Sequence, residues 1–180
     1  MKKRIIRMST FHTLLITRQL GKQIKERIIQ SLEHEEMDVV ILDFTGVQVL
    51  DFSWADECVA KLLAELNADL YHYKGILVEN CTDDQAENIA AALLQRNLYL
   101  IRLESLRWQI LGDLREPLFS TLNYLHQSKS VTARDVADYF QIAINTASNR
   151  LSELAKKHIV LRYEETLPNG GKQYVYQSLT

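Results

Sequence analysis

The 180-residue chain contains few of the residues that mark secreted, fibrous or disordered proteins. It has two cysteines, two prolines and six glycines, and 21 Lys and Arg stand against 23 Asp and Glu for a net charge of −2. Cys58 and Cys81 lie far apart, without a CxxC pair or a nearby His at ligand spacing, so we expect buried, reduced thiols. The hydrophobic fraction of 47% is that of a globular protein with a core.

Long apolar runs are also missing. No segment approaches the roughly 18 apolar residues that a membrane span needs. The basic start of the chain is not followed by an uninterrupted apolar stretch, because His12 and Arg18 interrupt it. We therefore expect a cytoplasmic protein with no membrane partner.

Motifs of the common enzyme classes are absent from the sequence. It contains no P-loop, GxGxxG or HExxH pattern. Three glutamates surround His34, but they end a predicted helix on its polar face, where we expect them to be solvated (Glu33, Glu35 and Glu36). The sequence predicts no enzyme, no catalytic residue, no metal site and no cofactor.

The charges are divided unequally along the chain. Residues 1–112 hold 13 basic and 16 acidic side chains, and residues 113–180 hold 8 and 7, so the net charges are −3 and +1. The signs are those of an acidic interaction module followed by a nucleic-acid reader, although the asymmetry is small.

The first half alternates strand-like and helix-like segments. Apolar runs predict strands at Arg4 to Met8, Phe11 to Thr17, Val39 to Leu42, Gly75 to Val78 and Leu98 to Leu103. Helical spacing predicts helices at Gln19 to Leu32, at Ser53 to Leu66 with Ser53 as the cap, and after a capping box of Thr82 and Gln85. This order predicts an α/β sandwich with a mixed sheet.

The second half predicts three helices and a hairpin. Pro117 suits the first turn of one helix, Thr132 caps a short second helix with Val136, Ala137 and Phe140 buried, and a third helix follows after a tight turn. In the third helix we expect the inward positions to be Ile144, Ala147, Leu151 and Leu154. Two strands, Ile159 to Tyr163 and Gln173 to Gln177, flank a turn with Pro168-Asn169-Gly170-Gly171.

Helices in this order, followed by a hairpin wing, make a winged helix-turn-helix. Leu114 to Leu179 resembles the small winged-helix domains of bacterial repressors, through the residues from Thr132 to Ala137, from Asn145 to Leu154, from Lys156 to Val160 and in the wing. Those families usually carry Gly before the wing, where positive φ is favoured, and here the residue is His158.

This interpretation predicts a partner, double-stranded DNA, and the residues that contact it. Short amides and hydroxyls near a helix N-terminus can contact phosphates and base edges in the major groove. We expect the contacts to come from Thr132, Asn145, Thr146, Ser148, Asn149, Arg150, Ser152, Lys156 and Lys172. The alternative is a winged helix used for dimerisation or protein docking, which the acidic residues Glu153, Glu164 and Glu165 favour.

A second resemblance covers about residues 5–100. The segment from Ile41 to Ser53 is similar to the core of STAS domains, the fold of anti-sigma factor antagonists. The junction Ser53-Trp54-Ala55-Asp56-Glu57 resembles more closely the STAS-like domain of unknown function, whose junction reads Ser-aromatic-Ala-Asp-Glu.

The STAS resemblance implies a partner site at the loop before the Ser53 helix. In the antagonists this serine is phosphorylated by a histidine-kinase-like ATPase, and a phosphate there sits at a helix N-terminus. The candidate residues are Asp51, Ser53 and Trp54; the chain departs from the antagonists in having Phe52 before the serine and Trp54 after it. Alternatively, Ser53 is only a helix cap.

Together these features predict two domains, STAS-like over residues 1–104 and winged helix-turn-helix over residues 105–180. Our hypothesis is a transcriptional regulator in which the first domain docks or senses and the second binds DNA, as a homodimer on two half-sites. The alternatives are a protein-interaction adaptor that does not bind DNA, an antagonist-like switch partnered with the ATPase, and a small-molecule sensor.

Overall fold

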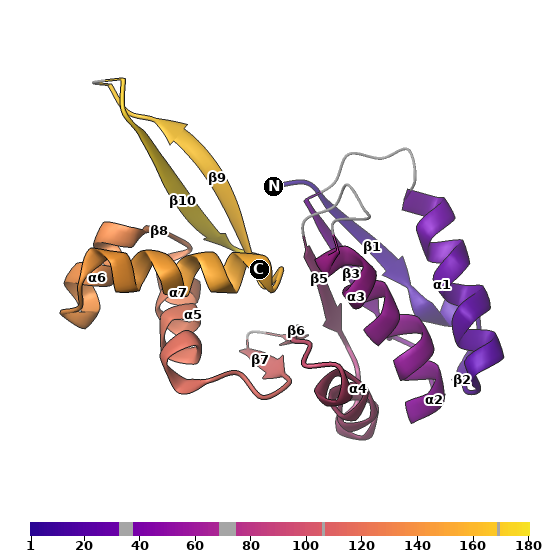
Figure 1. Ribbon diagram of the computed structural model, residues 1–180. Coiled ribbons are helices and arrows are strands. Elements are labelled where there is room, and N and C mark those ends of the chain that lie inside the picture. Colours follow the sequence, from indigo (N-terminus) through magenta and orange to yellow (C-terminus); the bar gives the residue numbers. More distant parts are fainter. Residues whose placement is uncertain (33–37, 69–74, 106, 169) are drawn as a thin grey trace. The chain divides into compact units, whose positions relative to one another are not determined.

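The computed structural model describes residues 1–32, 38–68, 75–105, 107–168 and 170–180, which form two compact units (Figure 1). The first unit is Met1–Asp113 and the second is Leu114–Thr180. The acidic group around His34 lies outside the described residues. No helix within the described ranges is both long and apolar enough to span a bilayer.

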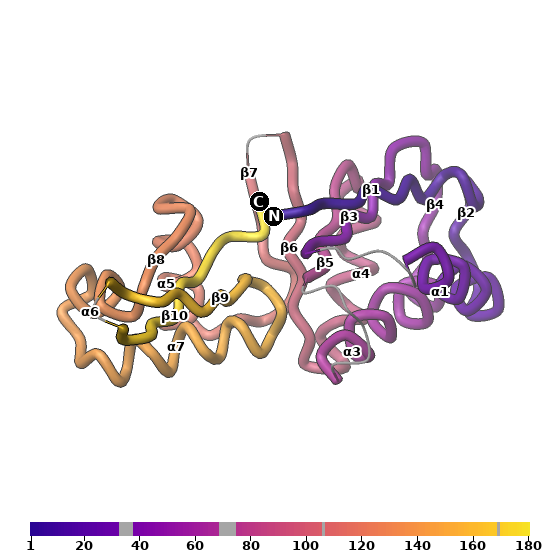
Figure 2. The backbone as a smooth tube through the Cα atoms, turned by 90° about the horizontal axis from the view of Figure 1, so that it is seen from above, coloured from indigo at the N-terminus to yellow at the C-terminus, as the bar shows by residue number. Residues whose placement is uncertain are grey.

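The boundary between the units lies later than the sequence predicts. We expected it after residue 104, but β7 (Arg107–Leu111) pairs antiparallel with β6 (Leu100–Glu104), from Leu100 opposite Leu111 to Glu104 opposite Arg107 (Figure 2). This hairpin completes the sheet of the first unit, so residues 105–113 belong there.

The sheet of the first unit is mixed, as predicted. Its strand order is β1-β3-β5-β6-β7, where β1 is Lys3–Arg7, β3 is Val39–Asp43 and β5 is Gly75–Glu79. The pairs β1–β3, β3–β5 and β5–β6 are parallel, and only the last pair is antiparallel. The strand expected over Phe11 to Thr17 is shorter: β2 (Leu14–Leu15) pairs with β4 (Val49–Leu50) in a separate two-stranded sheet.

Helices connect the parallel strands and share one hydrophobic core with them. They are α1 (Arg18–Leu32), α2 (Phe52–Ala55), a π-helical segment (Asp56–Ala60), α3 (Lys61–Asn67) and α4 (Asp83–Gln95). The capping box of Thr82 and Gln85 at the start of α4 is confirmed. All five residues of β3 are buried, as its uninterrupted apolar run predicts. Both cysteines are buried and free.

The second unit contains α5 (Glu116–Ser128), β8 (Ser130–Thr132), α6 (Ala133–Phe140), α7 (Ile144–Lys156), β9 (Val160–Thr166) and β10 (Lys172–Ser178). Its strands form a three-stranded sheet in the order β8-β10-β9, and β8 was not predicted. Thr132 caps α6 in a capping box with Asp135, and His158 has φ of 54°, both as predicted.

Two predictions of burial in the second unit are wrong. Ile144 was expected to face the core, but its side chain is 50% exposed. Ile144 is the first residue of α7, and the buried side of the helix begins one turn later, at Ala147. Phe140, expected to be buried, is half-buried among aromatic rings at the end of α6.

A buried carboxylate stabilises the carboxyl ends of β1, β3 and β5. The Oδ1 atom of Asp43 accepts hydrogen bonds from the Thr45 amide at 2.9 Å, the Thr45 hydroxyl at 2.6 Å and the Asn80 side chain at 2.9 Å, and its Oδ2 accepts one from Arg7 Nε at 3.1 Å. Burial alone would raise the pKa of Asp43, but these bonds outweigh it and lower the pKa to about 2.

The first prediction is that Asp43 makes the stability of the first unit sensitive to acid. The folded-state pKa lies below the ordinary unfolded value, so the stabilisation is complete at neutral pH and is lost as pH falls from about 4 to about 2. Asp43→Asn should lower the unfolding free energy by about 2 kcal/mol at pH 7 and by much less at pH 2. Urea titrations at both pH values measure this, with the exposed Glu87→Gln as the control. If Asp43→Asn lowers the unfolding free energy equally at both pH values, the prediction is wrong.

Candidate functional site

Helix α7 presents a polar face opposite its packed side. Ala147, Leu151 and Leu154 are buried. The predicted contact residues divide into the exposed Asn145, Thr146, Asn149 and Lys156 and the half-buried Ser148, Arg150 and Ser152. Asn145, Asn149, Ser152 and Lys156 recur at intervals of three and four residues, so they form one row along the helix.

The N-terminus of α7 has no side-chain cap. Its N-cap residue is Ala143, in an extended conformation with φ of −60° and ψ of 140°, and the Ala143 side chain makes no cap hydrogen bond to the first-turn amides. These N–H groups carry the positive end of the helix dipole and can bind an anion. The α6 helix differs, because Thr132 and Asp135 cap it.

Three predicted contact residues are already engaged within the fold. The Thr132 hydroxyl donates to Asp135 Oδ2 at 2.7 Å, the Ser152 hydroxyl lies 3.3 Å from the Tyr176 hydroxyl, and the Arg150 guanidinium lies 5.8 Å from the centre of the Phe140 ring. Thr132 therefore serves as the N-cap of α6 and is not part of the row on α7.

An ion pair compensates the acidic residue on the flank of α7. Arg115 Nη2 donates to both carboxylate oxygens of Glu153, at 2.7 and 2.8 Å, and Lys157 Nζ lies 3.8 Å away. Sequence reasoning counted Glu153 against DNA binding, but its charge is offset by basic neighbours. Arg150 and Lys156 therefore supply positive charge along α7.

The hairpin pairs its predicted phosphate contact with an acidic residue. Lys172, a predicted phosphate contact, donates to Glu164 Oε1 at 2.6 Å, and Gln173 donates to Glu165 at 2.8 Å. Arg162 lies over the Tyr174 ring, 4.7 Å from its centre. The charge of Lys172 is thus partly neutralised by the strand opposite.

The three predicted partner residues of the first unit, Asp51, Ser53 and Trp54, have different structural roles. Asp51, not Ser53, caps α2: its Oδ1 accepts from the Trp54 amide at 2.7 Å and its Oδ2 from the Thr17 amide at 3.2 Å. Ser53 is the second residue of α2 and half-buried, and its hydroxyl makes no hydrogen bond within the described residues. Trp54 is fully buried against Phe44, so it belongs to the core and cannot contact a partner.

One carboxylate joins three helical segments near Ser53. Asp56 accepts from Arg96 Nε at 2.7 Å and from Arg18 Nη1 at 2.6 Å. The Arg96 hydrogen bond is the main reason that the pKa of Asp56 lies below its ordinary value; burial opposes this shift and Arg18 adds to it.

An exposed apolar patch, formed by Leu14, Ile16 and Val49, lies beside this region. These side chains are 37%, 39% and 48% exposed, and Leu14 pairs directly with Val49 across β2 and β4. Asp51 follows β4 directly and holds the Thr17 amide that follows Ile16. Sequence reasoning missed the patch, although a short strand that is apolar on both faces is a signal for it.

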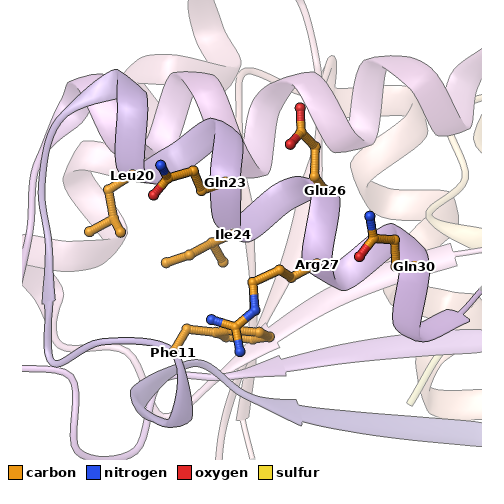
Figure 3. Close-up of a pocket in the computed structure, with 7 residues that line it drawn as sticks. All are labelled: Phe11, Leu20, Gln23, Ile24, Glu26, Arg27 and Gln30. Carbon is orange, nitrogen blue, oxygen red and sulfur yellow. The ribbon is translucent and has the colours of Figure 1, made fainter.

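A separate groove lies along α1. Leu20 and Ile24 point toward Phe11, and the Arg27 guanidinium lies over the Phe11 ring at 4.7 Å from its centre (Figure 3). Glu26 and Gln30 lie at its edge. Within the described residues, no buried polar side chain without a hydrogen-bond partner lines this groove.

Comparisons with known proteins include a partial likeness to a solved structure. No family model matches the chain, and no curated protein matches it. Among solved structures, a chain described as a possible transcriptional regulator from Methanosarcina mazei Go1 is similar at 16% identity with a TM-score of 0.35. The likeness covers 37% of this chain and 57% of that one, so it spans little more than half of that protein.

Proposed function

We propose that the protein is a transcriptional regulator in which a winged-helix second unit binds double-stranded DNA through α7 and a STAS-like first unit docks a protein partner. The observation that carries the DNA-binding proposal is α7 itself, where an uncapped N-terminus and a polar row share a helix with Arg150 and Lys156. In this function α7 lies in the major groove, its first-turn amides face a phosphate, and Asn145 and Asn149 contact base edges.

Local charge supports the proposal better than the net charge of the chain. With the boundary after Asp113, the second unit holds 8 basic and 6 acidic side chains, a net of +2. Two of its acidic residues, Glu153 and Glu164, are in ion pairs. Phosphate contacts depend on charges within a Debye length of about 10 Å, so a basic helix suffices for local binding.

We expect the two basic residues of α7 to set the salt dependence of DNA binding. If Arg150 and Lys156 each neutralise one phosphate, the double variant Arg150→Ala/Lys156→Ala should reduce the log–log salt slope by about 2 and weaken binding at low salt. Fluorescence anisotropy on a random duplex at several salt concentrations measures the slope. The control is Lys22→Ala/Arg107→Ala, which removes two exposed basic residues from the first unit. An unchanged slope removes both residues from the interface.

Another prediction concerns the uncapped first turn of α7. Ala143→Asp supplies a cap and should raise the unfolding free energy by about 1 kcal/mol. Its carboxylate would also accept the hydrogen bonds of the first-turn amides and repel a phosphate. The affinity for duplex DNA should therefore fall about tenfold or more. Ala143→Ser adds a neutral cap and should lose less affinity.

The pair of variants separates stability from binding. A more stable Ala143→Asp protein with reduced affinity supports a phosphate at this helix end. If Ala143→Asp binds duplex as tightly as the unaltered protein, the first turn of α7 does not face DNA.

The hairpin favours a second candidate function, a protein-interaction adaptor. Glu164 and Glu165 lie on β9, and the Lys172 that could approach a phosphate is paired with Glu164. A wing of this charge suits contact with protein better than contact with DNA. Binding to random duplex at two salt concentrations distinguishes the functions, because the adaptor gives no salt-sensitive binding.

For the first unit, the apolar patch of Leu14, Ile16 and Val49 supports docking of a protein. Such a patch, next to polar residues at a helix start, is typical of an interaction surface. The resemblance to STAS domains suggests a histidine-kinase-like ATPase as the partner. Ser53 fits the switch, because Asp51 rather than Ser53 caps the helix and the Ser53 hydroxyl is not needed for it.

We predict that Ser53 accepts a phosphate when the protein is incubated with such an ATPase and ATP. The phosphate would add about −2 charge next to Asp51, Asp56 and Glu57, so the start of α2 should become less stable and docking should weaken. Intact-mass analysis detects the modification, and Ser53→Ala is the control. A protein that docks the ATPase but stays unmodified contradicts the switch and leaves the docking function in place.

A further inference from the structure

The start of α7, residues 144–149, carries no charged side chain. Four of these residues are exposed: Ile144, Asn145, Thr146 and Asn149. The N-terminal residues of a helix that lies in the major groove are the ones that reach base edges. The chemistry of these four side chains therefore determines which base pairs the helix can distinguish.

Two of the four side chains are amides with free hydrogen-bonding groups. Asn145 and Asn149 lie one turn apart, on the side of α7 opposite the buried Ala147 and Leu151. Within the described residues, neither side-chain amide makes a hydrogen bond to the rest of the fold. An amide carries one acceptor and a donor group side by side, and the N6 amino group and N7 of adenine present the matching pair in the major groove.

The other two side chains present methyl groups beside the amides. Ile144 is 50% exposed, so core packing does not account for an isoleucine at this position. Thr146, two residues later, is also exposed. In the major groove the apolar group of a base pair is the C5 methyl of thymine, and apolar side chains pack against it.

The side chains that distinguish G·C pairs are missing from the start of α7. Guanine is bound best by Arg or Lys, and the cytosine amino group by Asp or Glu. The first charged residue of the helix is Arg150, whose guanidinium lies 5.8 Å from the centre of the Phe140 ring. The next, Glu153, accepts two hydrogen bonds from Arg115, and Lys156 lies in the last turn.

Taking α7 as the DNA-contacting helix proposed above, we infer that it selects A·T base pairs through their major-groove edges. The amides of Asn145 and Asn149 bind N6 and N7 of adenine. The methyl groups of Ile144 and Thr146 pack against thymine methyl groups. The basic side chains of α7 contact phosphates, which position the helix and carry no sequence information directly.

Base analogues test this selection in the intact protein. Selection of bound duplexes from a random library at low salt, with the full chain, should enrich A·T pairs. An inosine·cytosine pair has the minor-groove edge of A·T and the major-groove edge of G·C, so placing it at an enriched position should weaken binding about tenfold. Uracil in place of thymine removes only the methyl group and should weaken binding about fourfold.

Two variants assign these effects to side chains. Asn149→Ala should bind A·T and inosine·cytosine equally at one enriched position, and Ile144→Ala should bind thymine and uracil duplexes equally. Both side chains are exposed, so we expect both variants to fold. The control is Gln127→Ala, which removes an exposed amide from α5 and should keep both preferences.

The outcomes separate this selectivity from DNA binding itself. Salt-sensitive binding without an A·T preference overturns the inference and leaves the DNA-binding proposal in place. The same holds for an A·T preference that survives inosine·cytosine, because DNA shape or the minor groove is then recognised. It also holds if both variants keep the preferences of the unaltered protein. No salt-sensitive binding to any duplex overturns the DNA-binding proposal and the inference with it.

Discussion

The helical layer of the first unit depends on the carboxylate of Asp56. It receives one guanidinium from the start of α1 and another from the end of α4, while lying in the π-helical segment between α2 and α3. The side chain is only 6% exposed, so losing either arginine would leave a buried charge incompletely paired. Gly21 lets α1 approach this segment closely, since a Cβ there would lie 3.1 Å from the Trp54 carbonyl oxygen.

The ion pairs of Asp56 explain why the segment that resembles STAS-like domains has both buried, structural residues and residues nearer the surface. Trp54 and Asp56 turn inward and hold the helices together, whereas Asp51 and Ser53 are half-buried at the helix start. Half-buried residues on a rigid element are better suited to recognition than residues on a free loop. The apolar patch on β2 and β4 gains the same support, because Asp51 bonds the backbone directly after β2.

Local features of the fold were predictable from sequence, and long-range ones were not. The capping boxes at Thr82 and Thr132 and the positive φ of His158 depend on residues within a few positions of one another. The cap of α2 does not: Asp51 and Ser53 are both good caps, and the choice is tied to Thr17, 34 residues earlier in the chain. The pairings of β7 with β6 and of Lys172 with Glu164 are close in sequence, but they depend on hairpin formation and on its register. For this reason the sequence predicted which helix face carries the DNA-contact candidates, but not which of those side chains already have partners within the fold.

Charge compensation bears on the DNA-binding proposal for the second unit. Ion pairs between Arg115 and Glu153 and between Lys172 and Glu164 remove equal numbers of positive and negative charges from its surface. The proposed duplex contact of one copy then relies on a few basic side chains and one helix end, so it should be weak and sensitive to salt. Under that proposal a homodimer would strengthen the contact, because a second copy presents a second α7 to the other half-site.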